Sequence, residues 1–168
     1  MSNPRIVVLV GPHNSGKTGL LEYLVRRYSR AGCAVGVIKR AARPLQFDPA
    51  GKDSARFLNA GCRRVVTQGP GLVYTQTVEA QPASLPALVR EFKTGIECWL
   101  VESFEPESLP WLRVARSGQP APSIDRHCLA TVGDRPPDSR LPHFRLERPA
   151  ALARFLSPLL LSSGSTGD

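Results

Sequence analysis

The sequence predicts an α/β domain of three layers, in which helices cover a largely parallel sheet that carries some antiparallel additions. Two observations lead to this prediction. Several short runs, such as Arg5–Val10, are continuously apolar and rich in β-branched residues, as strands buried on both faces are. Segments with apolar residues at helical spacing separate these runs, and this alternation is typical of parallel sheets.

The N-terminal elements follow from local signals. Arg5–Val10 leads through a glycine-rich turn into a segment over Gly16–Ala31, whose leucines recur at helical spacing before Gly32. Cys33–Lys39 is a second apolar run and predicts a second buried strand. Lys52–Ala60 predicts a short helix that ends at a glycine.

The central elements continue the pattern. Arg64–Thr67 and Leu72–Val78 are rich in β-formers and predict strands. Ser84–Lys93 places its apolar residues on one face, as an amphipathic helix does. Ile96–Val101 is again continuously apolar, apart from its glutamate and cysteine, and predicts another buried strand.

The C-terminal third is expected to add two strands and a helix. Trp111–Ala115 and Cys128–Val132 predict the strands, and Pro149–Leu161 predicts a helix with proline in its first turn. Pro158 is expected to interrupt or end that helix. Residues 162–168 are polar and are expected to form a disordered tail, which leaves residues 1–161 as one domain.

Composition narrows the classes of function. The net charge of +8 favours anionic partners, but the basic residues are scattered, so nucleic acid is disfavoured. Because no apolar run reaches the 18 or so residues of a membrane span, a cytoplasmic protein is expected. The four cysteines form no C-x-x-C pair, so we expect buried free thiols in a reducing compartment.

The segment Gly11 to Thr18 is the motif that indicates a chemical function. It satisfies G-x-x-x-x-G-K-[ST], starts directly after a predicted buried strand and leads into a predicted helix. In that context, backbone N–H groups and the helix N-terminus face the phosphates, Lys17 neutralises their oxygens and the Thr18 hydroxyl ligates Mg²⁺. The sequence therefore predicts a P-loop NTPase fold that binds a nucleotide through Gly11, Pro12, His13, Asn14, Ser15, Gly16, Lys17 and Thr18.

Three carboxylates are candidates for the rest of the site. Glu102 ends a buried strand at the sheet edge that bears the loop, so it is expected to hold Mg²⁺ or its water shell and to serve catalysis. Asp48 follows the second strand and is given the same two roles, with a turn-forming aspartate as the alternative. Asp134 follows the strand Cys128–Val132 and is expected to accept both hydrogen-bond donors of guanine, although it lacks the Asn-Lys-x-Asp form.

The chain resembles a family, the molybdopterin-guanine dinucleotide biosynthesis accessory protein B, which consists of small P-loop GTP-binding proteins. The resemblance includes the loop and a Gly-Lys-Asp-Ser string that Ala-Gly follows. Its segments are Gly11 to Thr18, Gly36 to Lys39, Phe47-Asp48, Gly51 to Ser54, Ala60-Gly61, Leu100 to Glu102 with Phe104, Thr131 to Asp134, a closing strand at Leu141-Pro142 and the C-terminal helix.

The resemblance implies a homodimer with GTP and Mg²⁺ as cofactors and slow GTP hydrolysis. It implies that the protein assists the guanylyltransferase that attaches GMP to molybdopterin, and it leaves molybdopterin open as a further ligand. Two departures from the family pattern stand out. The segment Arg40 to Arg43 replaces a His-rich stretch. Where the family has Glu-Gly-Phe-Lys, this chain has Glu102-Ser103-Phe104-Glu105, so a serine replaces the glycine and a glutamate replaces the lysine. A small P-loop metabolite kinase and a basic module for polyanions or nucleic acid are the alternative functions.

Overall fold

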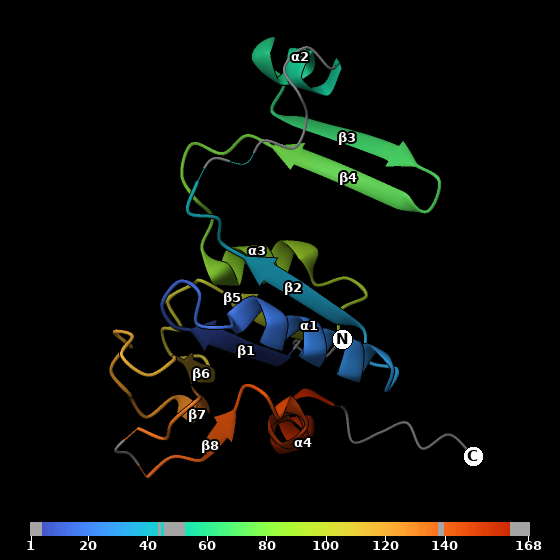
Figure 1. Ribbon diagram of the computed structural model, residues 1–168. Coiled ribbons are helices and arrows are strands. Elements are labelled where there is room, and N and C mark those ends of the chain that lie inside the picture. The colour runs from blue at the N-terminus through green and yellow to red at the C-terminus, as the bar shows by residue number, and fades with distance from the viewer. Residues whose placement is uncertain (1–4, 44, 46–52, 138–139, 162–168) are drawn as a thin grey trace, which may run out of the picture. The chain divides into compact units, whose positions relative to one another are not determined.

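The computed structural model describes residues 5–43, 45, 53–137 and 140–161 (Figure 1). Asp48 and the expected tail at 162–168 therefore lie outside the described residues. The chain forms two compact units, one made of residues 1–40 and 89–168 and the other of residues 41–88. We describe each unit by itself.

The larger unit holds a six-stranded sheet in the order β2-β5-β1-β6-β7-β8, and every described pairing in it is parallel. The strands are β1 (Arg5–Val10), β2 (Val35–Lys39), β5 (Cys98–Glu102), β6 (Trp111–Val114), β7 (Cys128–Gly133) and β8 (His143–Arg145). The central strand β1 pairs with β5 on one side and with β6 on the other. The residues that follow β1, β5, β6 and β7 consequently meet at one edge of the sheet.

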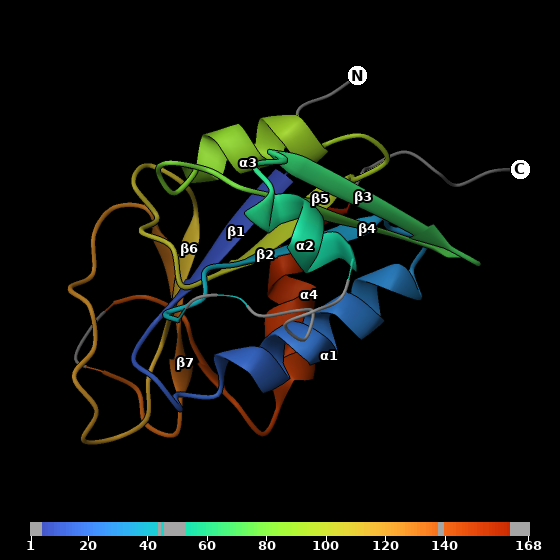
Figure 2. The same cartoon turned by 90° about the horizontal axis from the view of Figure 1, so that it is seen from above.

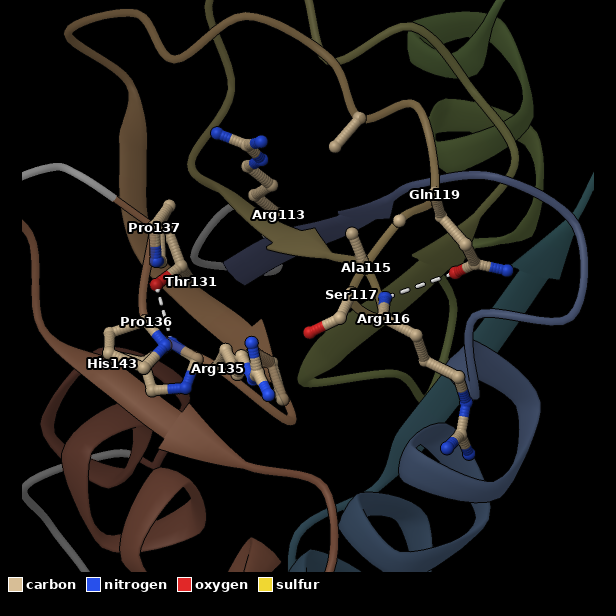
Figure 3. A pocket seen from close by; sticks show the side chains of 13 residues that line it. Arg113, Ala115, Arg116, Ser117, Gln119, Thr131, Arg135, Pro136, Pro137 and His143 are labelled. Atoms are coloured by element: carbon tan, nitrogen blue, oxygen red, sulfur yellow. Dashed lines mark hydrogen bonds between the residues drawn. The ribbon is translucent and has the colours of Figure 1, made fainter.

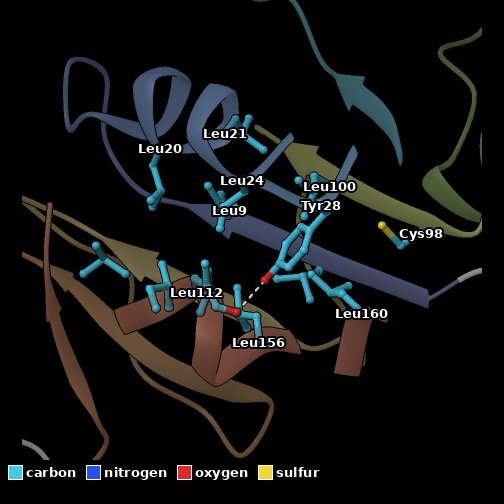
Figure 4. Close-up of a cluster of buried hydrophobic side chains, with 14 of the residues drawn as sticks. Leu9, Leu20, Leu21, Leu24, Tyr28, Cys98, Leu100, Leu112, Leu156 and Leu160 are labelled. Carbon is cyan, nitrogen blue, oxygen red and sulfur yellow. Dashed lines mark hydrogen bonds between the residues drawn. The ribbon is translucent and has the colours of Figure 1, made fainter. Parts of the chain in front are cut away.

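Helices α1 (Lys17–Ser29) and α4 (Pro149–Leu160) pack side by side on one face of this sheet (Figures 1 and 2). Figure 4 shows the core between them, where Leu9, Leu24 and Leu156 are almost fully buried. Tyr28 crosses this core and donates its hydroxyl hydrogen to the carbonyl oxygen of Ala153 at 2.9 Å. Removal of these apolar side chains from water is the main stabilisation of this unit.

The smaller unit contains α2 (Asp53–Asn59) and an antiparallel hairpin of β3 (Arg64–Gly69) and β4 (Leu72–Thr77). Helix α3 (Leu85–Phe92) spans the boundary between the units. None of the residues of α2 is buried, and the apolar side chains of the hairpin are largely exposed. An isolated two-stranded hairpin is marginally stable in water. Burial of its exposed apolar side chains by further contacts would therefore stabilise this unit.

The predicted mostly parallel sheet, with flanking helices and a small antiparallel addition, is confirmed. Three details were wrong. The closing strand is His143–Arg145 and not Leu141-Pro142, because Thr131 to Gly133 of β7 pair with the later residues. Pro158 does not end α4, which continues to the buried Leu160. Cys62 is exposed, whereas the other three cysteines are buried.

Within the part of the chain that the structure describes, no helix combines the length and the apolar character that crossing a bilayer demands.

Candidate functional site

The glycine-rich loop runs from the end of β1 to the start of α1, as predicted. It passes so close to β6 that a Cβ atom on Gly11 would lie 1.8 Å from the carbonyl oxygen of Val114. Asn14 and Gly16 have positive φ angles of 58° and 98°, which turn the backbone sharply before the helix. Gly11 is therefore required for space, and Gly16 for its left-handed conformation.

Lys17 directs its ammonium group into this loop. Its Nζ donates to the carbonyl oxygens of Gly11 at 3.0 Å and Pro12 at 2.6 Å, and to Oγ of Ser15 at 3.3 Å. Burial lowers the pKa of Lys17, the negative charge of Glu102 raises it, and the charge of Lys39 lowers it further. The loop therefore holds a cation whose desolvation an anionic ligand would offset.

Glu102, the last residue of β5, places a carboxylate beside the end of the loop. Glu102 is only 6% exposed, and its two carboxylate oxygens lie 3.4 and 3.5 Å from Oγ1 of Thr18. Lys39 ends β2 directly opposite Glu102 in the register, and its Nζ lies 3.5 Å from Oε2. A buried carboxylate and a hydroxyl are oxygen donors of the kind that bind Mg²⁺ together with water and phosphate oxygens, and they lie next to a lysine suited to those phosphate oxygens. The residues present thus fit a Mg²⁺-bound triphosphate.

The segment after Glu102 contains one of the departures from the family pattern. Ser103 has a φ angle of 66°, in the left-handed region that favours glycine. The next residue, Phe104, is buried, and the guanidinium of Arg40 lies 4.2 Å from the centre of its ring. Arg40, the first residue of the segment that replaces the His-rich stretch, is thus held over an aromatic ring by a cation–π interaction.

Asp134 lies beyond β7, as predicted, and the structure gives it a partner that sequence alone did not suggest. Its Oδ1 accepts hydrogen bonds from the backbone N–H of Ser117 at 2.7 Å and from the Ser117 hydroxyl at 3.1 Å. These bonds lower the pKa of Asp134, the backbone N–H of Ser117 contributing most. Asp134 is therefore an ionised, exposed side chain that holds the loop after β6.

That loop also contacts the glycine-rich loop. The side-chain amide of Gln119 donates to the carbonyl oxygen of His13 at 3.3 Å. A Cβ atom built on Gly16 would lie 3.8 Å from Nη2 of Arg116 and 3.2 Å from the methyl groups of Leu146. Residues that follow β6 and β8 thus surround the start of α1.

The structure brings together the glycine-rich loop, Thr18 and Glu102, and it places Asp134 at the same edge of the sheet. Asp48 cannot be placed, since it lies outside the described residues. Sequence reasoning missed Lys39 and Arg116 as members of the site. The position of Lys39 at the end of a predicted strand was a usable signal for it, whereas Arg116 follows its strand within a loop and has no motif around it.

Comparison with known proteins agrees with this geometry. Residues 6–134 match the family described as molybdopterin guanine dinucleotide synthesis protein B. A molybdopterin-guanine dinucleotide biosynthesis adapter protein of Haemophilus influenzae is 34% identical over 131 residues, which cover 76% of this chain and 74% of the relative. The adapter protein of Escherichia coli is 30% identical over 129 residues, which cover 73% of this chain and 74% of the relative.

The fold agrees as well. The crystal structure of Bacillus subtilis MobB aligns with a TM-score of 0.76 at 24% identity, and the alignment covers 94% of this chain and 99% of that one. The match over residues 6–134, which is more than half of the 168 residues, shows that the chain belongs to the molybdopterin guanine dinucleotide synthesis protein B family.

Proposed function

We propose that this protein is a GTP-binding adapter that assists the attachment of GMP to molybdopterin. One observation carries the proposal, which is the placement of Lys17, Thr18 and Glu102 around the loop between β1 and α1. The similar proteins of Haemophilus influenzae and Escherichia coli are named as adapter proteins of molybdopterin-guanine dinucleotide biosynthesis, which supports the pathway. The protein conditions a step that a partner carries out, in the cytoplasm, and is not itself the transferase.

Within this proposal, each part of the loop has a physical role. The backbone N–H groups of residues 13–18 surround the β- and γ-phosphates, and Lys17 exchanges its carbonyl partners for phosphate oxygens. Thr18 and Glu102 hold Mg²⁺ directly or through water, and Asp48 is proposed as a further ligand and catalytic group. When bound, Mg²⁺ supplies positive charge to the phosphate oxygens. Because no sequence motif identifies a residue that positions water, hydrolysis by the protein alone is slow.

Asp134 gives the proposal its base preference. Its Oδ1 holds Ser117, and the residue as a whole is exposed, so the carboxylate is accessible to guanine. Adenine offers no equivalent pair of donors to a carboxylate. We therefore expect GTP to bind more tightly than ATP.

Calorimetry tests the nucleotide site. Titration with GTP, ATP and inosine triphosphate, each with and without Mg²⁺, should rank GTP first and inosine triphosphate between the other two. Lys17→Ala should weaken GTP binding by about 2–5 kcal/mol, the usual range for removing one member of a desolvated charge pair. Lys93→Ala removes an exposed lysine and serves as the matched control. Unchanged GTP affinity in a folded Lys17→Ala variant would refute the site.

The hairpin supports the proposed homodimer. The register places Val66 and Val73 on the same face of the hairpin, and each is 59% exposed. A second copy of the chain would cover this face and stabilise an otherwise marginal hairpin. Analytical ultracentrifugation should show a dimer that Val66→Lys combined with Val73→Lys converts to a monomer. Ser108→Lys, an exposed position in the larger unit, should leave the dimer intact.

Reconstitution tests the pathway role. The purified guanylyltransferase, GTP and molybdopterin should yield more guanylated cofactor when this protein is added. The net charge of +8 should make the association with an acidic partner surface or with molybdopterin phosphate weaken as salt rises. Absence of both association and added product would refute the adapter role and leave only the nucleotide site.

A further inference from the structure

A hollow lined by both basic and apolar side chains lies in the larger unit, beside the strands β6, β7 and β8. Its volume is about 220 Å³. Figure 3 shows Arg113 and Arg135 on different sides of it, with Thr131 and His143 on the strands behind. This hollow is smaller than the roughly 300–1,000 Å³ of pockets for drug-sized ligands, so it suits a compact molecule.

The hollow is on the face of the sheet that α1 and α4 do not cover. Side chains along a strand alternate between its two faces. Leu112 and Val114 of β6 belong to the core beneath α1 and α4, so Arg113 between them points to the other face. Thr131 lies in the same way between Ala130 and Val132 of β7. The glycine-rich loop leads into α1 on the covered face instead, so Arg113 and Thr131 of the hollow lie on the opposite face of the sheet from that helix. The loop after β6, which includes Arg116 and Gln119, borders both the hollow and the glycine-rich loop.

The lining of the hollow is positively charged. Among the residues that the structure describes, three arginines, Arg113, Arg116 and Arg135, line the hollow, and none of the lining residues is acidic. In Figure 3 the side chain of Arg116 is directed toward α1, which leaves Arg113 and Arg135 to face the space. The nearby carboxylate of Asp134 is bound to Ser117. Guanidinium groups bind phosphate oxygens through two parallel hydrogen bonds, and this geometry favours arginine over lysine.

His143 provides an independent observation. Its Nδ1 lies 2.9 Å from Oγ1 of Thr131, whereas its Nε2 is buried without a hydrogen-bond partner among the described residues. The alternative acceptor for the Thr131 hydroxyl, the carbonyl of Pro142, is 3.5 Å away and is therefore the weaker partner. When the hydroxyl donates to Nδ1, the nearer of its two partners, the ring hydrogen is on Nε2, which is then an N–H donor. A buried donor without an acceptor costs free energy that a ligand oxygen would recover.

Part of the lining is apolar. This part includes Ala115, Ala121, Pro136 and Pro137. Such side chains offer no partner to a bare inorganic anion, but they can pack against the carbon atoms of an organic group.

From these observations we propose that the hollow binds a small phosphate ester. Arg113 and Arg135 hold the phosphate, His143 donates from Nε2, and the organic group packs against Pro136 and Pro137. This site goes beyond the proposed function and does not depend on it, because none of these residues belongs to the glycine-rich loop.

Nuclear magnetic resonance can test the proposal, because each candidate site contains one histidine whose ring resonances report on binding there. The chain has three histidines: His143 in the hollow, His13 in the glycine-rich loop and His127 elsewhere. Phenyl phosphate should shift the ring resonances of His143 in a saturable way at concentrations that leave His127 unchanged. A shift of His13 with no shift of His143 would mean that the probe binds only to the loop, and would overturn the proposal.

Variants separate the two sites. Arg113→Gln and Arg135→Gln should each weaken phenyl phosphate binding at least tenfold by calorimetry, while Arg126→Gln, outside the hollow, should not. Arg113→Lys should bind with intermediate affinity, because it keeps the charge but lacks the planar donor pair. Lys17→Ala should leave this affinity unchanged even if it abolishes GTP binding. Amide spectra of each variant verify that it is folded. Of the two glutamine variants, Arg135→Gln is expected to disturb the fold less, because it alters an exposed loop residue.

A comparison of phenyl phosphate with inorganic phosphate tests the organic part of the ligand. Phenyl phosphate should bind several times more tightly than inorganic phosphate, because only the ester buries carbon against the prolines. Equal affinities would overturn the assignment to an ester. Binding that neither arginine substitution weakens would overturn the site as a whole.

Discussion

The hydroxyl of Thr18 lies 3.4 Å from Oε2 of Glu102, although 84 residues separate the two in the chain. The pairing of β1 with β5 produces this closeness, since it places Leu9 opposite Glu102 just before the loop begins. Lys39 reaches the same carboxylate from β2. A hydroxyl, a buried carboxylate and a lysine therefore converge beside Lys17 through the register of parallel strands.

Glu102→Gln should weaken the dependence of the site on Mg²⁺. The amide keeps the shape of the side chain but removes the charge, so the gain in GTP affinity on adding Mg²⁺ should fall at least about tenfold, or ~1.4 kcal/mol. Mg²⁺-dependent hydrolysis should fall more than affinity does. Glu105→Gln removes an exposed carboxylate from the same edge and should change neither quantity. Hydrolysis indifferent to Glu102→Gln would contradict the assignment.

Asp134→Asn should reduce the preference for GTP over ATP by about tenfold or more, because an amide opposes one guanine donor with another. Ser117→Ala is the matched comparison, since it removes the 3.1 Å hydroxyl bond and retains the carboxylate and its 2.7 Å bond to the backbone. Calorimetry with both nucleotides measures the effect. If Ser117→Ala lost the preference as fully as Asp134→Asn, Asp134 would act by bracing the loop and not by reading the base.

Ser103→Gly should stabilise the protein. A non-glycine residue in the left-handed region costs roughly 1–2 kcal/mol, and the greater freedom of glycine in the unfolded chain offsets about 0.4–1 kcal/mol of the gain. The net increase in the free energy of unfolding should be about 0.5–1 kcal/mol in urea titrations. Ser108→Gly, a nearby serine for which no positive φ is found, should be neutral or destabilising. A loss of stability in Ser103→Gly would show that its hydroxyl outweighs the backbone strain.

The cysteines should differ sharply in reactivity. Burial raises the pKa of Cys98 from 9.0 to about 12 and also raises the pKa values of Cys33 and Cys128. At pH 8, a thiol reagent should therefore modify the exposed Cys62 at once and the other three only on unfolding. Rapid modification of two or more thiols in the folded protein would contradict this expectation.

The same shifts predict a loss of stability at alkaline pH. Above pH 9 the thiol of Cys98 ionises in the unfolded chain, but it stays protonated in the folded protein until about pH 12. The protonated thiol contributes its full stabilisation of the folded state below about pH 9. As the pH rises from 9 to 12, the unfolded state is favoured progressively and this stabilisation is lost. Urea titrations between pH 7 and 11 should show the decline, and Cys98→Ala should make it shallower, whereas Cys62→Ala should not.

The sequence by itself determined the strand, turn and helix around Gly11–Thr18, because contiguous residues form that unit and each carries a local signal. It also determined that Glu102 lies at the same edge, since a residue that ends a buried parallel strand has no other place to emerge. The same rule would have placed Lys39 at this edge, but the sequence analysis did not name it, and only the register showed that it contacts Glu102.

Only the tertiary structure decided the contact between Asp134 and Ser117, the approach of Arg116 to Gly16 and the hollow formed by Arg113, Thr131, Arg135 and His143. These residues come from different strands and from loops without a motif, so no local pattern relates them. Strand order and register decide which of their side chains meet, and both depend on the burial of apolar side chains throughout the sheet and its helices.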